Sequence, residues 1–520
     1  MQDRRLFIGC FTALVATAFG FIVRTQAIDQ WGAEFELNDT QIGEIIGAGL
    51  WPFAISIVLF SLIIDRIGYG KAMAFAFACH IATAVLMIVA KGYWGLYVAS
   101  FIGALGNGTV EAAINPVVAT MFSKEKTKWL NILHAGWPGG LVLAGLLALG
   151  MGENIDWRYK VGLIFLPTAA YGLILLGCPF PQNERVKAGV PFKSMLKEAG
   201  MLGALIVSIL IVFEVTRVFE QMGYIFKDWS DNAKLAARMG IVAAITLGFG
   251  AYVRSLGRPM FIFLVLVMIP LAITELGTDS WITPLMKPQM TQLGLQAGWV
   301  LVYTSAIMMV LRFFAGPIVH KLSPLGLLAI SSLIAAVGLV ALSKTTGVTI
   351  LAAATLYGVG KTFFWPTMLG VVTEQFPRGG ALTLNTISGV GMLGVGVVGA
   401  ALLGNIQDKE VDRVLLASKP DLHAQVAAPE KISIFGTYRP LDQEKLKSLS
   451  AAETKSITDI QDAAKKNALT TVAIFPVVML VCYLGLIGYF RARGGYKAEV
   501  LSGHAADDKK FTGGVKAAVR

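Results

Sequence analysis

Residues 102–122, with the sequence IGALGNGTVEAAINPVVATMF, combine the length of a membrane span with a single carboxylate at the centre. An ionisable side chain in the middle of a bilayer costs about 2.5–3.5 kcal/mol on insertion scales, so such a residue usually faces a pathway or a partner. Asn107, Glu111 and Asn115 are spaced four apart and therefore share one side of a helix. The segment predicts a transmembrane helix whose polar face lines a central cavity.

The composition is that of a protein with many membrane spans. Of the 520 residues, 55% are hydrophobic and 15% are charged, whereas soluble domains carry about 25% charged residues. Apolar runs of about 20 residues, the length of one span, recur along the chain. The net charge of +11 comes from Lys and Arg in short loops beside these runs. This pattern follows the positive-inside rule and does not indicate nucleic-acid binding.

Signals for other chemistry are missing from the sequence. The four cysteines fall in or next to apolar runs and have no paired loop spacing, so we expect neither a disulfide framework nor a zinc site. The sequence contains no phosphate-binding loop, no zinc-binding motif and no nucleophile-elbow motif of hydrolases, so we expect no cofactor, no metal and no enzymatic activity. We interpret the N-terminal MQDRR and the apolar run after it as a retained first helix.

A charged turn follows the second apolar run and contains Asp65, Arg66, Gly68 and Lys71. Here the chain resembles the major facilitator superfamily, whose loop between helices 2 and 3 carries the pattern Gly-x-x-x-Asp-Arg-x-Gly-x-Lys/Arg. Ser61 replaces the early glycine, and the basic residue comes one place late. The resemblance implies a gating motif whose charges pair in one conformation and separate in the other. The alternative is a solvated turn that anchors positive charge.

Two further strings resemble the fucose/glucose–proton symporter branch of that superfamily. EAAINP at residues 111–116 is similar to its Glu-x-x-x-Asn-Pro pattern, and LNILH at residues 130–134 is similar to its Leu-Asn-x-Leu-His pattern. The resemblance implies that Glu111 takes part in proton coupling and sugar binding, with Asn115 as its hydrogen-bonding neighbour. His134 is a candidate for proton coupling, and Trp137 for stacking on a sugar ring. A static ion pair for Glu111 and a structural hydrogen bond for His134 are the alternatives.

An internal repeat divides the chain into halves. The offset between matching positions stays near 250–255 residues for three pairs: Asp65 with His320, Asn115 with Trp365, and Leu130 with Leu384. We therefore expect an all-α polytopic membrane protein with two pseudo-symmetric six-helix bundles and about two helices inserted between them. A 12-helix chain with peripheral half-helices is the alternative. The expected parts are a bundle at 1–180, a cytoplasmic loop with inserted helices at 181–257, a bundle at 258–490 that includes an outer loop at 407–466, and a cytoplasmic tail at 491–520.

Charged residues in the second half complete the predicted site. Glu275 and Asp279 lie four apart in helix 7, where they could bind a proton, Na⁺ or sugar hydroxyls, or form an outer gate. Lys361 stands at the repeat position of Glu111, which predicts an ion pair between the halves that protonation makes and breaks. We expect Arg312 close to the cytoplasm, as a gating or snorkelling residue.

Arg24 in helix 1 is a candidate for binding an anionic or polyhydroxylated substrate, and its alternative role is snorkelling to the outer interface. Other residues predicted to line the substrate site are Asn107, Asn115, Trp137, Tyr357, Trp365 and Asn385.

The resemblance implies a secondary transporter that works by rocking its halves about a midplane site. The leading hypothesis is proton-coupled symport of a monosaccharide-like solute. Because Arg24 stands where some members of the branch carry an acid, transport of an organic anion held by Arg24 and Lys361 is the second hypothesis. The third is a non-transporting membrane sensor. We expect a monomer in a bacterial inner membrane, with both termini cytoplasmic and with the solute, H⁺ and lipid as its partners.

Overall fold

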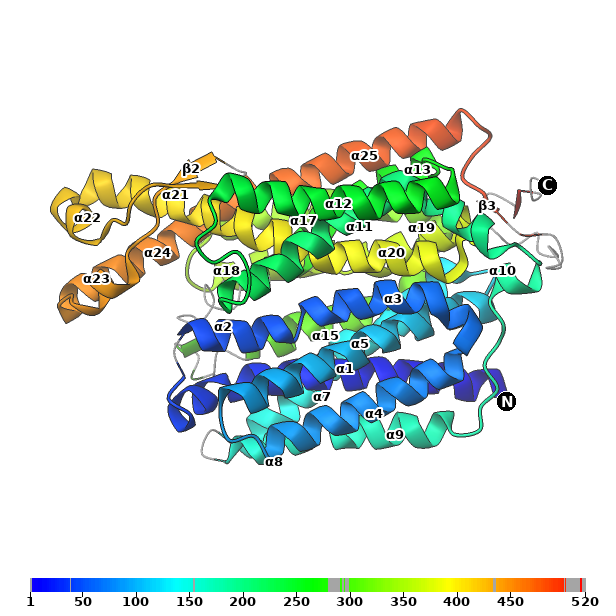
Figure 1. The fold of residues 1–520 in the computed structure, drawn as a ribbon, viewed down its shortest axis with the longest axis horizontal. Helices are drawn as coiled ribbons and strands as arrows, with labels where there is room; N and C mark the ends of the chain where they lie inside the picture. Colours follow the sequence, from blue (N-terminus) through cyan, green and yellow to red (C-terminus); the bar gives the residue numbers. More distant parts are fainter. Residues whose placement is uncertain are drawn as a thin grey trace.

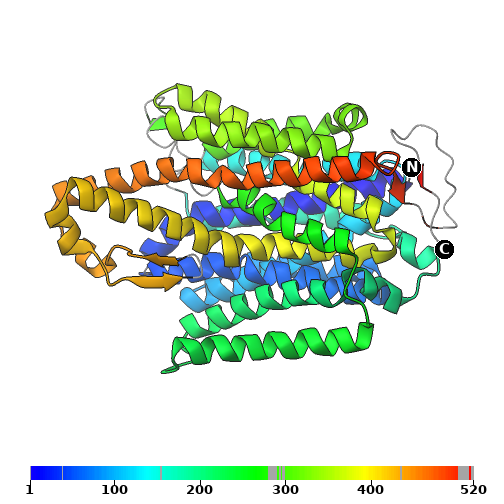
Figure 2. The same ribbon diagram turned by 90° about the horizontal axis from the view of Figure 1, so that it is seen from above.

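The computed structural model describes residues 2–37, 39–152, 155–278, 290–291, 294, 299–433, 436–499, 501 and 515–516. Long helices run nearly side by side, and both chain ends lie at the same end of the molecule (Figure 1). We call this the terminus-bearing end. At the other end, which we call the protruding end, the segment from α21 (Ala400–Ser418) to α24 (Ala451–Val472) extends beyond the remaining helices (Figure 2).

The N-terminal half contains six long helical units, three of which are broken. Gly68 forms the turn between the second and third units. Its φ of 85° is a conformation that glycine adopts easily, and it allows the chain to reverse there. The breaks in the second and fifth units lie just before Pro52 and Pro138, because a proline removes a helical hydrogen bond. The helices are α1 (Gln2–Glu34), α2 (Asp39–Ala48), α3 (Trp51–Ile67), α4 (Tyr69–Ile88), α5 (Tyr93–Met121), α6 (Lys126–His134), α7 (Gly136–Met151), α8 (Trp157–Gly162) and α9 (Phe165–Leu175).

The C-terminal half repeats this plan with more distortion. The pair α15 and α16 is bent by 62°, and the segments η1 and η3 are π-helical. Its helices are α13 (Pro259–Ala272), η1 (Ile273–Gly277), α15 (Trp299–Phe313), α16 (Ala315–Leu322), α17 (Pro324–Lys344), α18 (Thr349–Lys361), α19 (Phe364–Gln375), η2 (Pro377–Gly379), α20 (Gly380–Leu393), η3 (Gly394–Gly399), α21 (Ala400–Ser418), α24 (Ala451–Val472) and α25 (Ile474–Arg491).

Two full-length helices, α11 (Phe192–Gln221) and α12 (Asp231–Val253), follow the short helix α10 (Glu184–Lys187) and join the halves. α11 packs against α12 and α20. Both α11 and α12 are long and apolar enough to cross a membrane. The predicted fold class, two six-helix bundles with two inserted helices, is confirmed. In the described part, ten helices are long and apolar enough for a span when helices that continue one another are counted as one, and the bent pair α15–α16 is an eleventh.

The segment predicted as an outer loop at 407–466 is largely helical. α21 and α24 pack side by side beyond the spans. Between them lie α22 (Pro420–Val426), the antiparallel strands β1 (Lys431–Ser433) and β2 (Gly436–Tyr438), and α23 (Gln443–Lys447). A small core of Leu415, Leu422, Val426 and Ile457 holds this protrusion together. In the C-terminal tail, β3 (Ala498–Glu499) pairs with β4 (Val515–Lys516).

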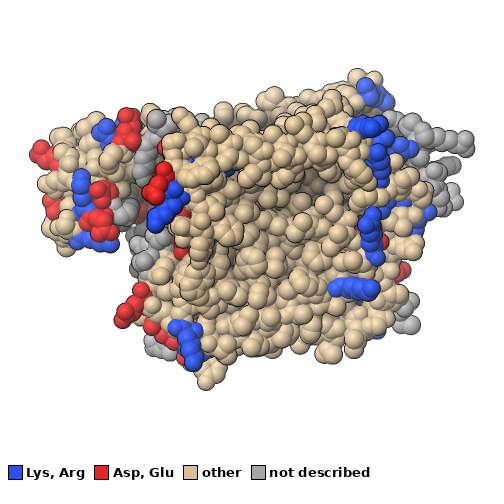
Figure 3. Space-filling model, in the orientation of Figure 1, with Lys and Arg blue, Asp and Glu red and all other residues tan. Residues whose placement is uncertain are grey.

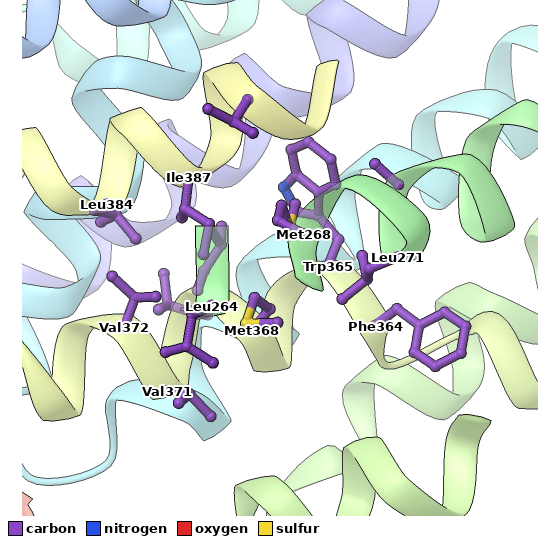
Figure 4. Packing of buried hydrophobic residues seen from close by; sticks show 14 of the residues in the cluster. Leu264, Met268, Leu271, Phe364, Trp365, Met368, Val371, Val372, Leu384 and Ile387 are labelled. Carbon is purple, nitrogen blue, oxygen red and sulfur yellow. The ribbon is translucent and has the colours of Figure 1, made fainter. Parts of the chain in front are cut away.

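The distribution of side chains fits a membrane protein. On the face seen in Figure 3, Lys and Arg gather at the terminus-bearing end, acidic and basic residues are mixed at the protruding end, and an uncharged band lies between them. Buried apolar side chains from α13, α19 and α20 interlock beneath this surface (Figure 4). Trp365 packs so tightly against Gly391 that a Cβ there would lie 2.8 Å from the indole. The chain is an integral membrane protein.

Candidate functional site

Arg312 lies between the two halves and is 2% exposed. It belongs to the last turn of α15, just before the 62° bend. Its guanidinium donates three hydrogen bonds: Nε to the Thr362 carbonyl at 2.8 Å, Nη1 to the His134 carbonyl at 2.9 Å, and Nη2 to Oε1 of Glu275 at 2.8 Å. A side chain buried in this way does not snorkel, so that part of the expectation is wrong. The gating role of Arg312 stays a prediction.

Two of these acceptors, the carbonyls of His134 and Thr362, are available to Arg312 because prolines follow them in the chain. His134 lies four residues before Pro138, and Thr362 lies four residues before Pro366. A proline has no N–H, so each of these carbonyls lacks its usual donor within the helix. Backbone groups inside a membrane must be satisfied within the protein. Arg312 supplies the missing donor to both.

Glu275 lies in the π-helical segment η1 and is 3% exposed. Besides Arg312, it binds the backbone N–H of Trp365, which donates to Oε2 at 2.9 Å. That N–H belongs to the first turn of α19, where the helix dipole favours a negative charge. Lys361 also attracts the Glu275 carboxylate electrostatically. Asp279, predicted as the second acid of this helix, lies outside the described residues.

Glu111 begins a chain of hydrogen bonds through the N-terminal half. Nδ2 of Asn115 donates to Oε2 of Glu111 at 2.5 Å, and Oδ1 of Asn115 lies 3.0 Å from Nε2 of His134. Since Oδ1 can only accept, Nε2 of His134 carries the proton in this arrangement. All three side chains are buried. Arg312 attracts the Glu111 carboxylate electrostatically, so the chain reaches the C-terminal half.

Among the described residues, no ion pair joins Glu111 to Lys361, so the predicted pair is not formed in this structure. Arg312 attracts the Glu111 carboxylate electrostatically, and Lys361 attracts that of Glu275. Nζ of Lys361 lies 5.5 Å from the ring centre of Tyr357. The sequence repeat predicts that Glu111 and Lys361 lie at the same level along their helices. It does not predict how far each helix is rotated about its own axis.

The other predicted substrate-binding residues are distributed over several environments. Oδ1 of Asn107 lies 2.9 Å from Nε2 of His80, whose other nitrogen faces Tyr171, so Asn107 belongs to a polar cluster inside the N-terminal half. The Tyr357 hydroxyl bonds to Thr278 and to the Thr274 carbonyl. Trp137 packs beside Phe21, and Nδ2 of Asn385 donates to the Ala112 carbonyl at 3.1 Å.

Arg24 is half-buried and packs against the break between α2 and α3. Its Nε donates to the Gly20 carbonyl at 3.0 Å. A Cβ at Gly49 would lie 1.9 Å from Nη1, so only glycine leaves room for the guanidinium there. Among the side chains that the structure describes, no carboxylate forms an ion pair with Arg24.

The halves are closed against each other at the terminus-bearing end. Oε1 of Glu374 accepts from Oγ1 of Thr127 at 2.6 Å and from its N–H at 3.2 Å, which places a C-half carboxylate at the N-terminus of α6. Nε2 of His320 lies 2.9 Å from Glu125. Burial acts to raise the pKa of Glu125, but hydrogen bonds from Lys128 and His320 outweigh it and hold this pKa below its usual value.

Helix α10 contributes two buried ion pairs to this closed end. Arg185 pairs with Asp65 at 2.6 Å, and Glu184 pairs with Lys126 at 2.7 Å. Nζ of Lys126 also reaches the Thr373 carbonyl of the C-terminal half at 3.2 Å. In the rest of the predicted gating motif, Arg66 lies over the Phe192 ring, Gly68 forms the turn, and Lys71 is exposed. The sequence alone did not indicate that Arg185 is the partner of Asp65.

Comparison with known proteins identifies the family. The family model described as Major Facilitator Superfamily matches residues 6–276, more than half of the chain. The chain is 22% identical over 214 residues to a probable sugar efflux transporter of Helicobacter pylori (strain G27), covering 40% of this chain and 54% of that protein. It is 23% identical over 231 residues to the cis,cis-muconate transport protein of Acinetobacter baylyi, covering 42% and 54%. The chain thus spans about half the length of these curated relatives.

Comparison with solved structures extends the similarity beyond the residues that these sequence comparisons match. The crystal structure of the E. coli fucose:proton symporter FucP superimposes with a TM-score of 0.54, covering 92% of this chain and 98% of that one at 14% identity. At this identity the likeness shows the fold alone. Taken with the family match, it extends the same architecture over both halves. The chain belongs to the Major Facilitator Superfamily of membrane transporters for small molecules.

Proposed function

We propose that this protein symports a monosaccharide-like solute with a proton, and that Glu111 carries the proton. The observation that supports this most is the buried chain of hydrogen bonds from Glu111 through Asn115 to His134, with Arg312 of the opposite half attracting the Glu111 carboxylate electrostatically. A buried carboxylate near a single cation can exist both charged and neutral, because the cation offsets part of the cost of burial. Such a group suits a carrier that must bind and release a proton in each cycle.

The same geometry suggests how the proton would act on the halves. A charged Glu111 attracts Arg312 across the interface and helps to hold the closed end together. A protonated Glu111 loses this attraction, so the halves separate more readily at the terminus-bearing end. Basic residues gather at that end, and the positive-inside rule supports our proposal that it lies in the cytoplasm, with the protein in a bacterial inner membrane.

The direct test is accumulation in proteoliposomes under an imposed pH gradient, with fucose, glucose and xylose as probes. A gradient of about one pH unit is worth about 1.4 kcal/mol per proton and supports about tenfold accumulation. We expect accumulation of at least one of these sugars, and we expect a protonophore to abolish it. Uptake that reaches the same level with and without the gradient would contradict proton coupling.

Transport of an organic anion is the second candidate, because Arg24 has no carboxylate partner among the described side chains. A half-buried guanidinium without a counter-ion suits a carboxylate ligand. One relative named above is a cis,cis-muconate transport protein. If this candidate is right, muconate will raise the melting temperature of the protein more than the sugars do. Arg24→Gln should then abolish muconate uptake, whereas sugar uptake in the same variant should persist under the leading proposal.

A further inference from the structure

Three prolines within long helical units share one local arrangement. Pro116 in α5, Pro138 in α7 and Pro366 in α19 each leave the carbonyl four residues earlier without a helical donor. These carbonyls belong to Ala112, His134 and Thr362. We call them the proline-freed carbonyls.

Each proline-freed carbonyl receives a side-chain donor from the C-terminal half. Nδ2 of Asn385 donates to Ala112 at 3.1 Å, Nη1 of Arg312 donates to His134 at 2.9 Å, and Nε of Arg312 donates to Thr362 at 2.8 Å. The bonds to Ala112 and His134 cross from one half to the other. All the donors and acceptors lie on buried residues, where an unpaired polar group is costly.

We propose that Pro116 and Pro138 are positioning residues for alternating access, because they create the acceptors that hold the halves together while the terminus-bearing end is closed. Opening that end moves α5 and α6 away from α15 and α20, so both crossing bonds must lengthen or break. An alanine at either position would supply an N–H to the carbonyl from within its own helical unit. The carbonyl would then compete less for the donor of the other half, and the closed state would be weakened.

The reporter for opening is a cysteine placed at Thr373, which is 8% exposed at the closed interface. The parent chain carries Thr373→Cys, with the native cysteines at positions 10, 79, 178 and 482 replaced by alanine. The rate of maleimide labelling in proteoliposomes then reports how often the terminus-bearing end opens. Gly370→Val provides the reference for an open end, because a Cβ at Gly370 would lie only 2.2 Å from Oγ1 of Thr127.

We expect Pro138→Ala and Pro116→Ala each to label about ten times faster than the parent, a change of about 1.4 kcal/mol in the opening equilibrium. Pro270→Ala is the matched control, since Pro270 also lies inside a span but, in the described part of the chain, the carbonyl four residues earlier receives no side-chain donor from the other half. It should label at the parent rate.

The donors can be removed independently of the prolines. Asn385→Ala should speed labelling as Pro116→Ala does, and the double variant should be no faster than either single variant, because both remove the same bond. Parent-like rates for Pro116→Ala, Pro138→Ala and Asn385→Ala, with fast labelling of Gly370→Val, would overturn the proposal. Equal acceleration by Pro270→Ala would also overturn it, since helix straightening alone would then explain the effect. Neither outcome depends on the identity of the solute or the coupling ion.

Discussion

Replacing Glu111 with glutamine is expected to abolish solute accumulation driven by a pH gradient while leaving solute exchange across the membrane largely intact. Glutamine keeps the size of the side chain and can still bond to Asn115, but it cannot take up or release a proton. The variant resembles the protonated carrier in all parts of the cycle. It should therefore reorient with solute bound, and it should fail in the steps that need a charged Glu111.

The measurement compares two assays on the same proteoliposomes. Accumulation under a pH gradient of about one unit should fall from about tenfold to equality between the two sides. Counterflow of labelled solute against unlabelled solute should remain. Glu214→Gln is the control, because Glu214 is a buried acid in the inserted helix α11, where it pairs with Arg217 outside the site. Normal accumulation by the Glu111 variant would remove Glu111 from the mechanism.

Arg312→Met should cause the largest loss of stability among single substitutions in the site. It leaves the His134 and Thr362 carbonyls without their side-chain donor and removes the ion pair from Glu275. Removing one partner of a buried ion pair costs about 3–5 kcal/mol, because the remaining charge stays buried without compensation. Thermal unfolding in detergent should show this loss, and transport should be absent.

Two further variants separate the contributions to this loss. In Arg312→Met with Glu275→Gln, residue 275 no longer carries a buried charge without its partner, so part of the stability should return, with a coupling of about 1–3 kcal/mol between the two sites. Arg413→Met, which breaks an exposed ion pair with Glu410 in the protrusion, should change stability by less than about 0.5 kcal/mol. A melting temperature for Arg312→Met equal to that of the wild type would contradict the assigned role.

The architecture could be predicted because it depends on patterns that a sequence carries directly. Span length, the basic loops and the repeat offset indicate two six-helix bundles with inserted helices, and the structure confirms this fold. The burial of Glu111 and its contact with Asn115 also follow from spacing on one helix. Contacts between neighbours on a single helix need no knowledge of the tertiary fold.

Contacts between helices could not be predicted in the same way. Four residues turn an α-helix by about 400°, so each such step drifts by about 40°. Asn107 is therefore about 80° away from Asn115, which is enough for it to face His80 while Asn115 faces His134. The position of Arg312 depends on the 62° bend after α15 and on two helix breaks in other spans. The prolines mark these breaks in the sequence, but they do not identify the side chain that donates a hydrogen bond to each carbonyl left without a helical donor.

The central claim, that Glu111 carries the coupled proton, is tested most directly by measuring proton movement itself. The sugar that accumulates best is added to lightly buffered proteoliposomes without an imposed gradient, and the external pH is recorded. We predict that wild-type protein alkalinises the medium as solute enters, and that Glu111→Gln produces no pH change although its counterflow persists. Equal alkalinisation by the wild type and the variant would contradict the claim.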